Sequence, residues 1–390
     1  MEDLDVLVAS ARFDVCSDNV RDPSASPLRF IHRAALPGGG SIPLFKVLQT
    51  NVCTNDCAYC ANQVGRDCPR ASLQPDQLAK TFMQLHGKKL VRGLFLTSGI
   101  AGNASRTMES MIKTVEILRY RYEFEGYIHL KILPGASFDC VAAGCKLADR
   151  VSINMEAPTT QHLAKLSSKK DLHRDIVERM RWVKRLTASN ERLVPSGQTT
   201  QFVVGAAGET DRDLLQTTVA LYQEMELRRV YFSAFRPIRG TTLEELRPTS
   251  PLREHRLYQA DWLFRVYGFS LPELEYALGE RGNLPLAKDP KLVIAHKQPW
   301  LYPVDINEAS YAELLRVPGI GPVSARRIVE ARREHSIFSL EQLRKMRVPT
   351  KRALPFIWFQ GMLPSERQTS FLPEVDDAMD QPLPLAAVLG

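Results

Sequence analysis

The 390-residue sequence has no run of 18 or more uncharged apolar residues, which excludes a conventional transmembrane helix. Its first residues are acidic and lack the long apolar stretch of a secretory signal, so we expect a cytoplasmic protein without a membrane partner. Glycine (22) and proline (25) are too few for a fibrous or disordered chain. The eight histidines are scattered and form neither an H-x3-H nor an HExxH pattern, so no histidine-based metal motif is present.

Charge is nearly balanced along the whole chain, with 51 Lys and Arg against 44 Asp and Glu and a net charge of +7. The excess is unevenly distributed. Residues 305–363 hold ten basic and six acidic residues, whereas residues 364–390 hold one basic and five acidic residues together with four prolines. The basic segment suits a polyanionic partner, and we expect the proline-rich acidic tail to be disordered.

Short apolar runs alternate with amphipathic stretches through the middle of the chain. We expect strands at 44–50, 93–99, 127–135, 150–158, 199–206 and 229–237, and helices at 74–90, 107–123, 138–147, 171–188, 211–226 and 252–267. Six such units predict an α/β fold with a parallel sheet and helices outside it. Periodicity alone leaves open whether the sheet closes partly into a barrel or is an open, doubly wound sheet.

Changes in this pattern predict the domain organisation. The expected segments are an N-terminal extension (1–43), the alternating core (44–270), a proline-interrupted connector (271–303), a small all-α domain (304–363) and the tail (364–390). Within the all-α domain, capping boxes that begin at Ser310 and Ser339 predict two helix starts, and a further helix is expected over 322–334.

Three of the seven cysteines, Cys53, Cys57 and Cys60, lie within eight residues, directly after the first expected strand. In barrel-like α/β folds, loops at the carboxyl ends of the strands form the active site. Three thiolates on one loop can hold three corners of a [4Fe–4S] cluster and leave the fourth iron open, whereas an electron-transfer cluster usually has four thiolates. A zinc site completed by Cys68 or a distant histidine is an alternative, as are incidental core cysteines.

The segment C-T-N-D-C-A-Y-C, with an aromatic residue before the last cysteine, resembles the signature of the radical S-adenosylmethionine (radical SAM) enzymes. The resemblance covers about residues 40–270 and implies a (β/α)6 partial TIM-type barrel, with a [4Fe–4S] cluster and SAM as cofactors. In that family the reduced cluster cleaves SAM to a 5′-deoxyadenosyl radical, which abstracts hydrogen from the substrate. The resemblance also implies an electron donor such as flavodoxin or ferredoxin.

The same resemblance implies positions that bind SAM. After the second strand, Ser98 and Gly99 stand where the family usually has a Gly-Gly-Glu-like turn, although the glutamate is missing here. Alternate residues of the fourth expected strand share one face, and on it Asn154 and Glu156 resemble the position that binds the SAM ribose. Gly205, on the fifth strand, resembles the glycine beside the adenine. Structural roles at a strand edge or in packing are the alternatives.

The segment V-P-G-I-G-P, followed by V-S-A-R-R-I, looks like a helix-hairpin-helix DNA-binding element. Gly319, Ile320 and Gly321 form a turn whose backbone N–H groups can approach a phosphate, because glycine has no Cβ to block the way. The next helix adds the positive end of its dipole. Arg326 and Arg327 would follow the phosphate backbone without reading sequence. The alternative is an ordinary helical hairpin with a solvated basic face.

The cluster motif and the hairpin on one chain resemble a small bacterial family of radical SAM proteins associated with DNA modification or repair, whose substrate is not established. This resemblance spans about residues 1–360 and implies DNA as a partner, together with a uracil-DNA-glycosylase-like protein. We therefore expect a radical SAM enzyme that acts on nucleic acid. A DNA-bound iron–sulfur redox sensor without catalysis and an RNA-modifying radical SAM enzyme are the other two hypotheses.

Overall fold

The computed structural model describes residues 2–11, 31–35 and 41–359, and these form two compact units. The first unit takes in the described residues up to 209 together with 220–250, and the second takes in 210–219 and the residues from 251 onward. Cys16 and the acidic tail lie outside the described residues. Across the described ranges, no helix has the length and apolar character needed to cross a bilayer.

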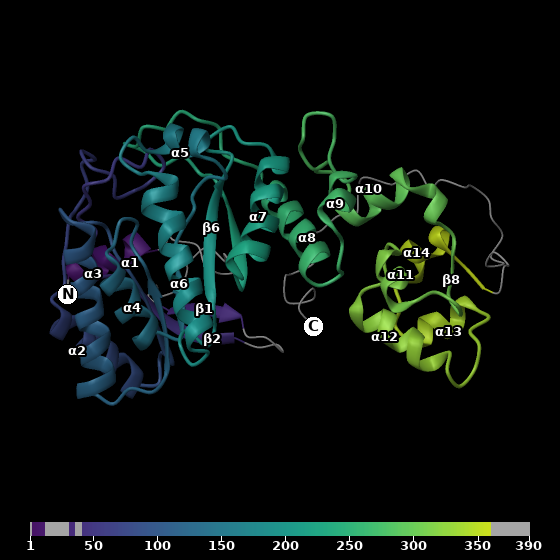
Figure 1. The fold of residues 1–390 in the computed structure, drawn as a ribbon, viewed down its shortest axis with the longest axis horizontal. Helices are drawn as coiled ribbons and strands as arrows, with labels where there is room; N and C mark the ends of the chain where they lie inside the picture. Colours follow the sequence, from purple (N-terminus) through teal and green to yellow (C-terminus); the bar gives the residue numbers. More distant parts are fainter. Residues whose placement is uncertain (1, 12–30, 36–40, 360–390) are drawn as a thin grey trace. The chain divides into compact units, whose positions relative to one another are not determined.

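The first unit is built on one seven-stranded sheet, in which the strand order follows the chain. Figure 1 labels β1, β2 and β6 of this sheet. Its strands are β1 (Ile31–Ala35), β2 (Ser41–Leu48), β3 (Gly93–Thr97), β4 (Tyr127–Lys131), β5 (Arg150–Ser152), β6 (Gln198–Val204) and β7 (Arg229–Ala234). The six predicted strands are β2 to β7, and they are parallel. Strand β1, which pairs antiparallel with β2, was not predicted, because its five residues (IHRAA) carry no clear periodicity.

The strand order decides between the two sheet types that the sequence left open. Each new strand is added at the same edge of the sheet, as in a barrel, whereas a doubly wound sheet reverses direction at an internal strand. The sheet curls into a half-barrel, along which neighbouring helices pack side by side (Figure 1). These helices are α2 (Pro75–Gly87), α3 (Ala104–Glu116), α4 (Phe138–Leu147) and α6 (Glu178–Ser189). The unit also contains α5 (Thr160–Leu166), and α7 (Asp211–Met225) is divided between the units, with its residues up to Val219 in the second unit. Shorter elements complete the unit: α1 (Glu2–Ala11), which contacts β2, and the π-helical turns η2 (Ile117–Arg121) and η3 (Leu172–Val177).

Strand β5 is shorter than its predicted range, and a side chain explains why. The Thr200 hydroxyl donates to the carbonyl oxygen of Ile153 (2.7 Å) and accepts from the backbone N–H of Met155 (3.0 Å). The hydroxyl thus replaces a backbone partner on β6. Glu156 then adopts a positive φ of 65°. The regular alternation that placed Asn154 and Glu156 on one strand face therefore does not extend this far.

The second unit is helical in its described residues, apart from a short parallel pairing of β8 (Val304–Asp305) with β9 (Ile357–Trp358). Its helices are α8 (Pro251–Arg265), α9 (Leu271–Glu275), α10 (Pro290–Lys297), η4 (Pro299–Leu301), α11 (Tyr311–Arg316), α12 (Pro322–Ala331), α13 (Leu340–Lys345), α14 (Thr350–Ala353) and η5 (Leu354–Phe356). Helices α9 and α10 lie within the expected connector. Their prolines, Pro272 and Pro290, do not interrupt them, because both lie in first helical turns, where proline is tolerated.

Both predicted capping boxes are present. Ser310 caps α11 with Glu313, and Ser339 caps α13 with Gln342. In each box the serine hydroxyl accepts a hydrogen bond from the third helical residue, whose side chain bonds back to the serine backbone. Buried apolar residues from α11 to β9 form one core, which positions the turn between α11 and α12.

Candidate functional site

The cysteine loop, residues 50–60, lies at the carboxyl edge of the half-barrel, shortly after β2. Cys57 is buried, and Cys53 and Cys60 are half-buried. The backbone N–H of Cys60 donates to the Cys57 carbonyl oxygen (2.9 Å), which closes a tight turn. The three side chains are close enough to influence one another electrostatically. The half-buried Cys68 instead directs its thiol to the Ala61 carbonyl oxygen.

Burial changes the chemistry of these thiols. It raises the pKa of Cys57, and it raises the pKa of Cys60 to about 12, with neighbouring cysteines adding to the effect. The ammonium of Lys170 acts in the opposite direction on both thiols. A buried thiol with a raised pKa stays protonated unless a cation stabilises the thiolate. A bound metal centre would supply that charge.

The donor set on this loop, three cysteine thiols, suits the corners of a [4Fe–4S] cluster. Among the described residues, no three His, Cys, Asp or Glu side chains are grouped so that they could hold one metal ion. A [4Fe–4S] cluster makes a different demand, because each thiolate binds its own iron. Backbone N–H groups of Ile100 and Asn62 point to the sulfurs of Cys53 and Cys60, each at 3.4 Å. Such hydrogen bonds orient and tune sulfur ligands.

The turn after β3 packs against the cysteine loop and supports it through hydrogen bonds. The N–H of Gly99 donates to the Thr50 carbonyl oxygen (2.7 Å), and the Ser98 hydroxyl reaches the same oxygen (3.4 Å). A Cβ on Gly99 would lie 2.4 Å from the carbonyl oxygen of Val52, so the two backbones can approach this closely only at glycine. Ser98 and Gly99, which the sequence predicts to bind SAM, thus also support the loop.

Asn154 and Glu156 are both buried but differ in their partners. The Asn154 Oδ1 atom has no hydrogen-bond partner within the described part of the chain. Leaving such an acceptor unsatisfied costs roughly 1–3 kcal/mol, so this atom is suited to a hydroxyl donor on a ligand. Glu156 is instead held by the protein, since the Lys170 ammonium lies 3.5 Å from its Oε1 atom and the Tyr59 hydroxyl bonds to it.

Gly205 lies directly after β6, where the sequence predicts the glycine beside the adenine. Its φ of 90° is in the left-handed region that favours glycine. The carboxylate of the buried Glu209 accepts from the N–H of Gly205 and from that of Ala207 (3.2 Å). This glutamate fixes the turn, and the sequence analysis did not single it out.

Sequence reasoning also missed residues 166–170 (LSSKK), which hold the cysteine loop from the other side. Their bonds run from the Ala58 N–H to the Leu166 carbonyl oxygen (2.8 Å), from Ser167 and Ser168 to the Asp56 carboxylate, and from Lys169 Nζ to the Thr54 carbonyl oxygen (2.6 Å). Burial alone would raise the pKa of Asp56, but the serine hydrogen bonds outweigh it and lower this pKa to about 2. The side-chain partners are 111 to 115 residues apart, so no local pattern could reveal them.

The predicted hairpin is the turn between α11 and α12. Gly319 has a φ of 84°, and a Cβ there would lie 2.9 Å from the Cβ of Arg352. The Ile320 side chain is fully buried in the helical core, so it anchors the turn and does not face solvent. Gly321 is the N-cap residue of α12. The fold of the turn therefore requires glycine at Gly319, whereas Gly321 has an extended backbone that other residues can adopt.

Charged residues surround this hairpin. Arg326 and Arg327 are exposed on α12, and Arg327 also donates to the Met346 carbonyl oxygen (3.1 Å). The buried Lys291 of α10 donates to the carbonyl oxygen of Ile320 (2.6 Å) and braces the turn from inside. Burial lowers the pKa of Lys291 to about 7.

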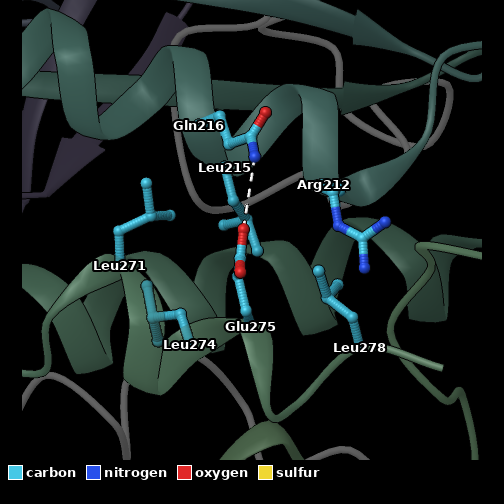
Figure 2. Close-up of a pocket in the computed structure, with 7 residues that line it drawn as sticks. All are labelled: Arg212, Leu215, Gln216, Leu271, Leu274, Glu275 and Leu278. Atoms are coloured by element: carbon cyan, nitrogen blue, oxygen red, sulfur yellow. Dashed lines mark hydrogen bonds between the residues drawn. The ribbon is translucent and has the colours of Figure 1, made fainter.

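A small pocket lies between α7 and α9 in the helical unit (Figure 2). It is lined by Arg212, Leu215, Gln216, Leu271, Leu274, Glu275 and Leu278. Across it, the Gln216 amide donates to the Glu275 carboxylate (3.2 Å). None of these residues belongs to the cysteine loop or the hairpin, so the pocket is part of neither candidate site.

The described residues combine a half-barrel, which carries a three-cysteine loop at its carboxyl edge, with a helical unit that contains the glycine hairpin. The comparisons agree with this description. Residues 47–220 match the Radical SAM superfamily model, and residues 302–352 match the model of the helix-hairpin-helix motif. The chain thus contains a radical SAM domain. Members of the superfamily use a [4Fe–4S] cluster and SAM, and they need an electron donor.

Solved structures with similar folds share little sequence with this chain. HydG, a maturase of the [FeFe]-hydrogenase, has 10% identity and a TM-score of 0.45, over 56% of this chain and 49% of that chain. HydG from Carboxydothermus hydrogenoformans has 11% identity and a TM-score of 0.43, over 54% and 48%. Methylornithine synthase (PylB) has 16% identity and a TM-score of 0.45, over 55% and 60%. The matched regions thus span between 48% and 60% of these proteins. The curated proteins include no match to the chain.

Proposed function

We propose that the chain is a radical SAM enzyme that acts on nucleic acid in DNA modification or repair, with its cluster held by Cys53, Cys57 and Cys60. The observation that carries the proposal is the presence of a radical SAM domain and a helix-hairpin-helix motif on one chain. When bound, the cluster supplies the electron for reductive cleavage of SAM. Asn154 would then accept a hydrogen bond from the SAM ribose, and the turn at Gly205 would lie against the adenine.

The helical unit would anchor the nucleic acid through its phosphates. Arg326 and Arg327 are exposed on α12, whose N-terminus follows directly on the hairpin. Such contacts carry no base information, so affinity should depend little on sequence. A base inside a duplex must be flipped out, or the strand must be single, before chemistry can reach it. Flavodoxin or ferredoxin as electron donor and a uracil-DNA-glycosylase-like protein as partner belong to the same proposal.

Fluorescence anisotropy at several salt concentrations tests the anchoring. Each neutralised phosphate contributes about −0.9 to the slope of log K against log salt, so the Arg326→Gln, Arg327→Gln double variant should flatten the slope by about 2. Arg181→Gln, an exposed arginine on α6, is the matched control and should leave the slope unchanged. Equal slopes for all three proteins would remove the hairpin from nucleic-acid binding.

Nucleoside mass spectrometry tests the substrate class. Reduced, cluster-loaded protein is incubated with SAM and either single-stranded DNA, duplex DNA or total RNA, and the nucleosides are compared with those from a Cys57→Ala control. We expect a changed nucleoside in a DNA digest, together with 5′-deoxyadenosine. A change confined to RNA would move the assignment to RNA modification. A reduced cluster that never yields 5′-deoxyadenosine would favour the redox sensor.

A further inference from the structure

Residues 166–170 end in a lysine whose side chain is directed into the protein. The first four of these residues bind the cysteine loop, but only Lys170 reaches a cysteine sulfur. Its side chain is 8% exposed, and its Nζ atom lies 3.5 Å from Glu156 Oε1. It also hydrogen-bonds to the Cys57 side chain. Burying an ammonium is costly unless it is paired. An apolar side chain could pack at this position without that cost, so packing alone does not account for a lysine here.

The carboxylate that pairs with Lys170 is itself firmly held. Glu156 donates its backbone N–H to the Gln201 carbonyl oxygen (2.9 Å) and accepts from the Val203 N–H (2.8 Å), so both its backbone groups are bound to β6. Its side chain also takes a hydrogen bond from Tyr59, which lies between the second and third cysteines in sequence. The position of the Lys170 ammonium is therefore fixed by the sheet as well as by its own segment.

We propose that Lys170 is a positioning residue that sets the reduction potential of the cluster through its charge and its hydrogen bond to Cys57. The inference rests on the proposed cysteine ligands. Reduction adds one negative charge beside the Cys57 sulfur, and the potential of such clusters depends on net charge and on hydrogen bonds to the sulfurs. A buried cation at this sulfur favours the reduced state. Glu156 offsets part of its charge and so acts in the opposite direction.

The test is an anaerobic redox titration of cluster-loaded full-length protein, followed by electron paramagnetic resonance, without SAM or nucleic acid. Lys170→Met removes the charge while keeping the volume, and reduction should become ten- to a hundredfold less favourable, a shift of about −60 to −120 mV for one electron. Lys170→Arg should retain most of the wild-type potential. Lys146→Met, which changes an exposed lysine on α4 away from the cysteine loop, is the matched control and should not shift it.

Glu156→Gln provides a second measurement, in which the reduction potential of the cluster should shift in the opposite direction. It removes the negative charge and should make reduction more favourable, so the inference stays testable even if Lys170→Met fails to fold. An unchanged potential in Lys170→Met with its full iron content, or a shift of the same sign in both variants, would overturn the inference. If the wild-type protein assembles no cluster, the proposed function fails as well, so the two failures are distinguishable.

Discussion

The cysteine loop and the glycine hairpin are both short turns with a proposed function, but they are stabilised in different ways. The cysteine loop is held from distant parts of the chain: the turn at Gly99, the end of β5 at Glu156, and residues 166–170. The hairpin is held by partners that are nearer in sequence, since Ile320 lies in the helical core and Lys291, which bonds to its carbonyl oxygen, is 29 residues away. Changes remote in sequence should therefore disturb the first turn more readily than the second.

The two turns also differ in the groups that they present. The cysteine loop offers side-chain sulfurs, whose reactivity depends on burial and on the nearby ammonium of Lys170. The hairpin is proposed to offer backbone N–H groups and the end of a helix, which need a defined backbone shape and no particular side chain. Mutations should therefore separate the two functions cleanly, since iron content reports on one turn and the salt dependence of nucleic-acid binding reports on the other.

The largest expected effect is on the cysteine loop. Wild-type protein reconstituted without oxygen should bind about four irons and four sulfides per chain, and Cys57→Ala should abolish this binding because one corner of the cluster loses its ligand. Iron and sulfide analysis with absorbance spectroscopy is the measurement. Cys145→Ala, which changes a buried cysteine of α4, is the matched control and should keep the cluster. Zinc in place of iron in protein purified without oxygen would contradict the assignment.

A pair of glycine variants gives the next largest effect and compares the two turns directly. A Cβ on Gly99 meets the Val52 carbonyl oxygen, whereas a Cβ on Gly319 meets Arg352 and requires a left-handed backbone. Each change to alanine should destabilise its own unit by roughly 1–3 kcal/mol, as overpacking does. Gly99→Ala should reduce iron uptake, and Gly319→Ala should reduce nucleic-acid affinity alone.

Urea denaturation, iron analysis and anisotropy measure these variants together. Gly87→Ala is the matched control, because a Cβ there meets no atom within 4 Å. It should leave iron uptake and nucleic-acid affinity unchanged and should not lower stability, since alanine favours the helix more than glycine does. If Gly319→Ala lowered iron uptake as much as Gly99→Ala does, the two turns would not be independent in the way that their contacts indicate.

The sequence predicts the parts of both turns that depend on local pattern. The three cysteines, the capping box at Ser310 and the glycines of the hairpin can be predicted because each forms a short pattern whose defining residues lie a few positions apart in the sequence. The parts that could not be predicted depend on contacts between distant residues. Thr200 ends β5 by bonding across to it, and Lys170 meets Cys57 only after the chain has folded.

The smallest expected effect is a pH dependence that reports on the attachment of residues 166–170 to the cysteine loop. Burial would raise the pKa of Asp56, but the hydrogen bonds from Ser167 and Ser168 lower it from 3.8 to about 2 in the folded chain. A carboxyl group with a lowered folded-state pKa contributes stability above its unfolded pKa and loses it as the pH falls. This contribution should therefore be complete above about pH 4 and decline towards pH 2. Because Asp56 is only partly buried, solvent screens it, and we expect its contribution to stability to be less than about 1 kcal/mol.

Urea midpoints of full-length protein without added iron, measured from pH 5 to pH 2.5, should fall less steeply for Asp56→Asn than for wild type. Asp67→Asn, an exposed aspartate close to the loop in sequence, should match the wild-type slope. Identical slopes for Asp56→Asn and wild type would show that the two serines do not hold this carboxylate, and the contrast between a loop held from afar and a hairpin held locally would lose one of its supports.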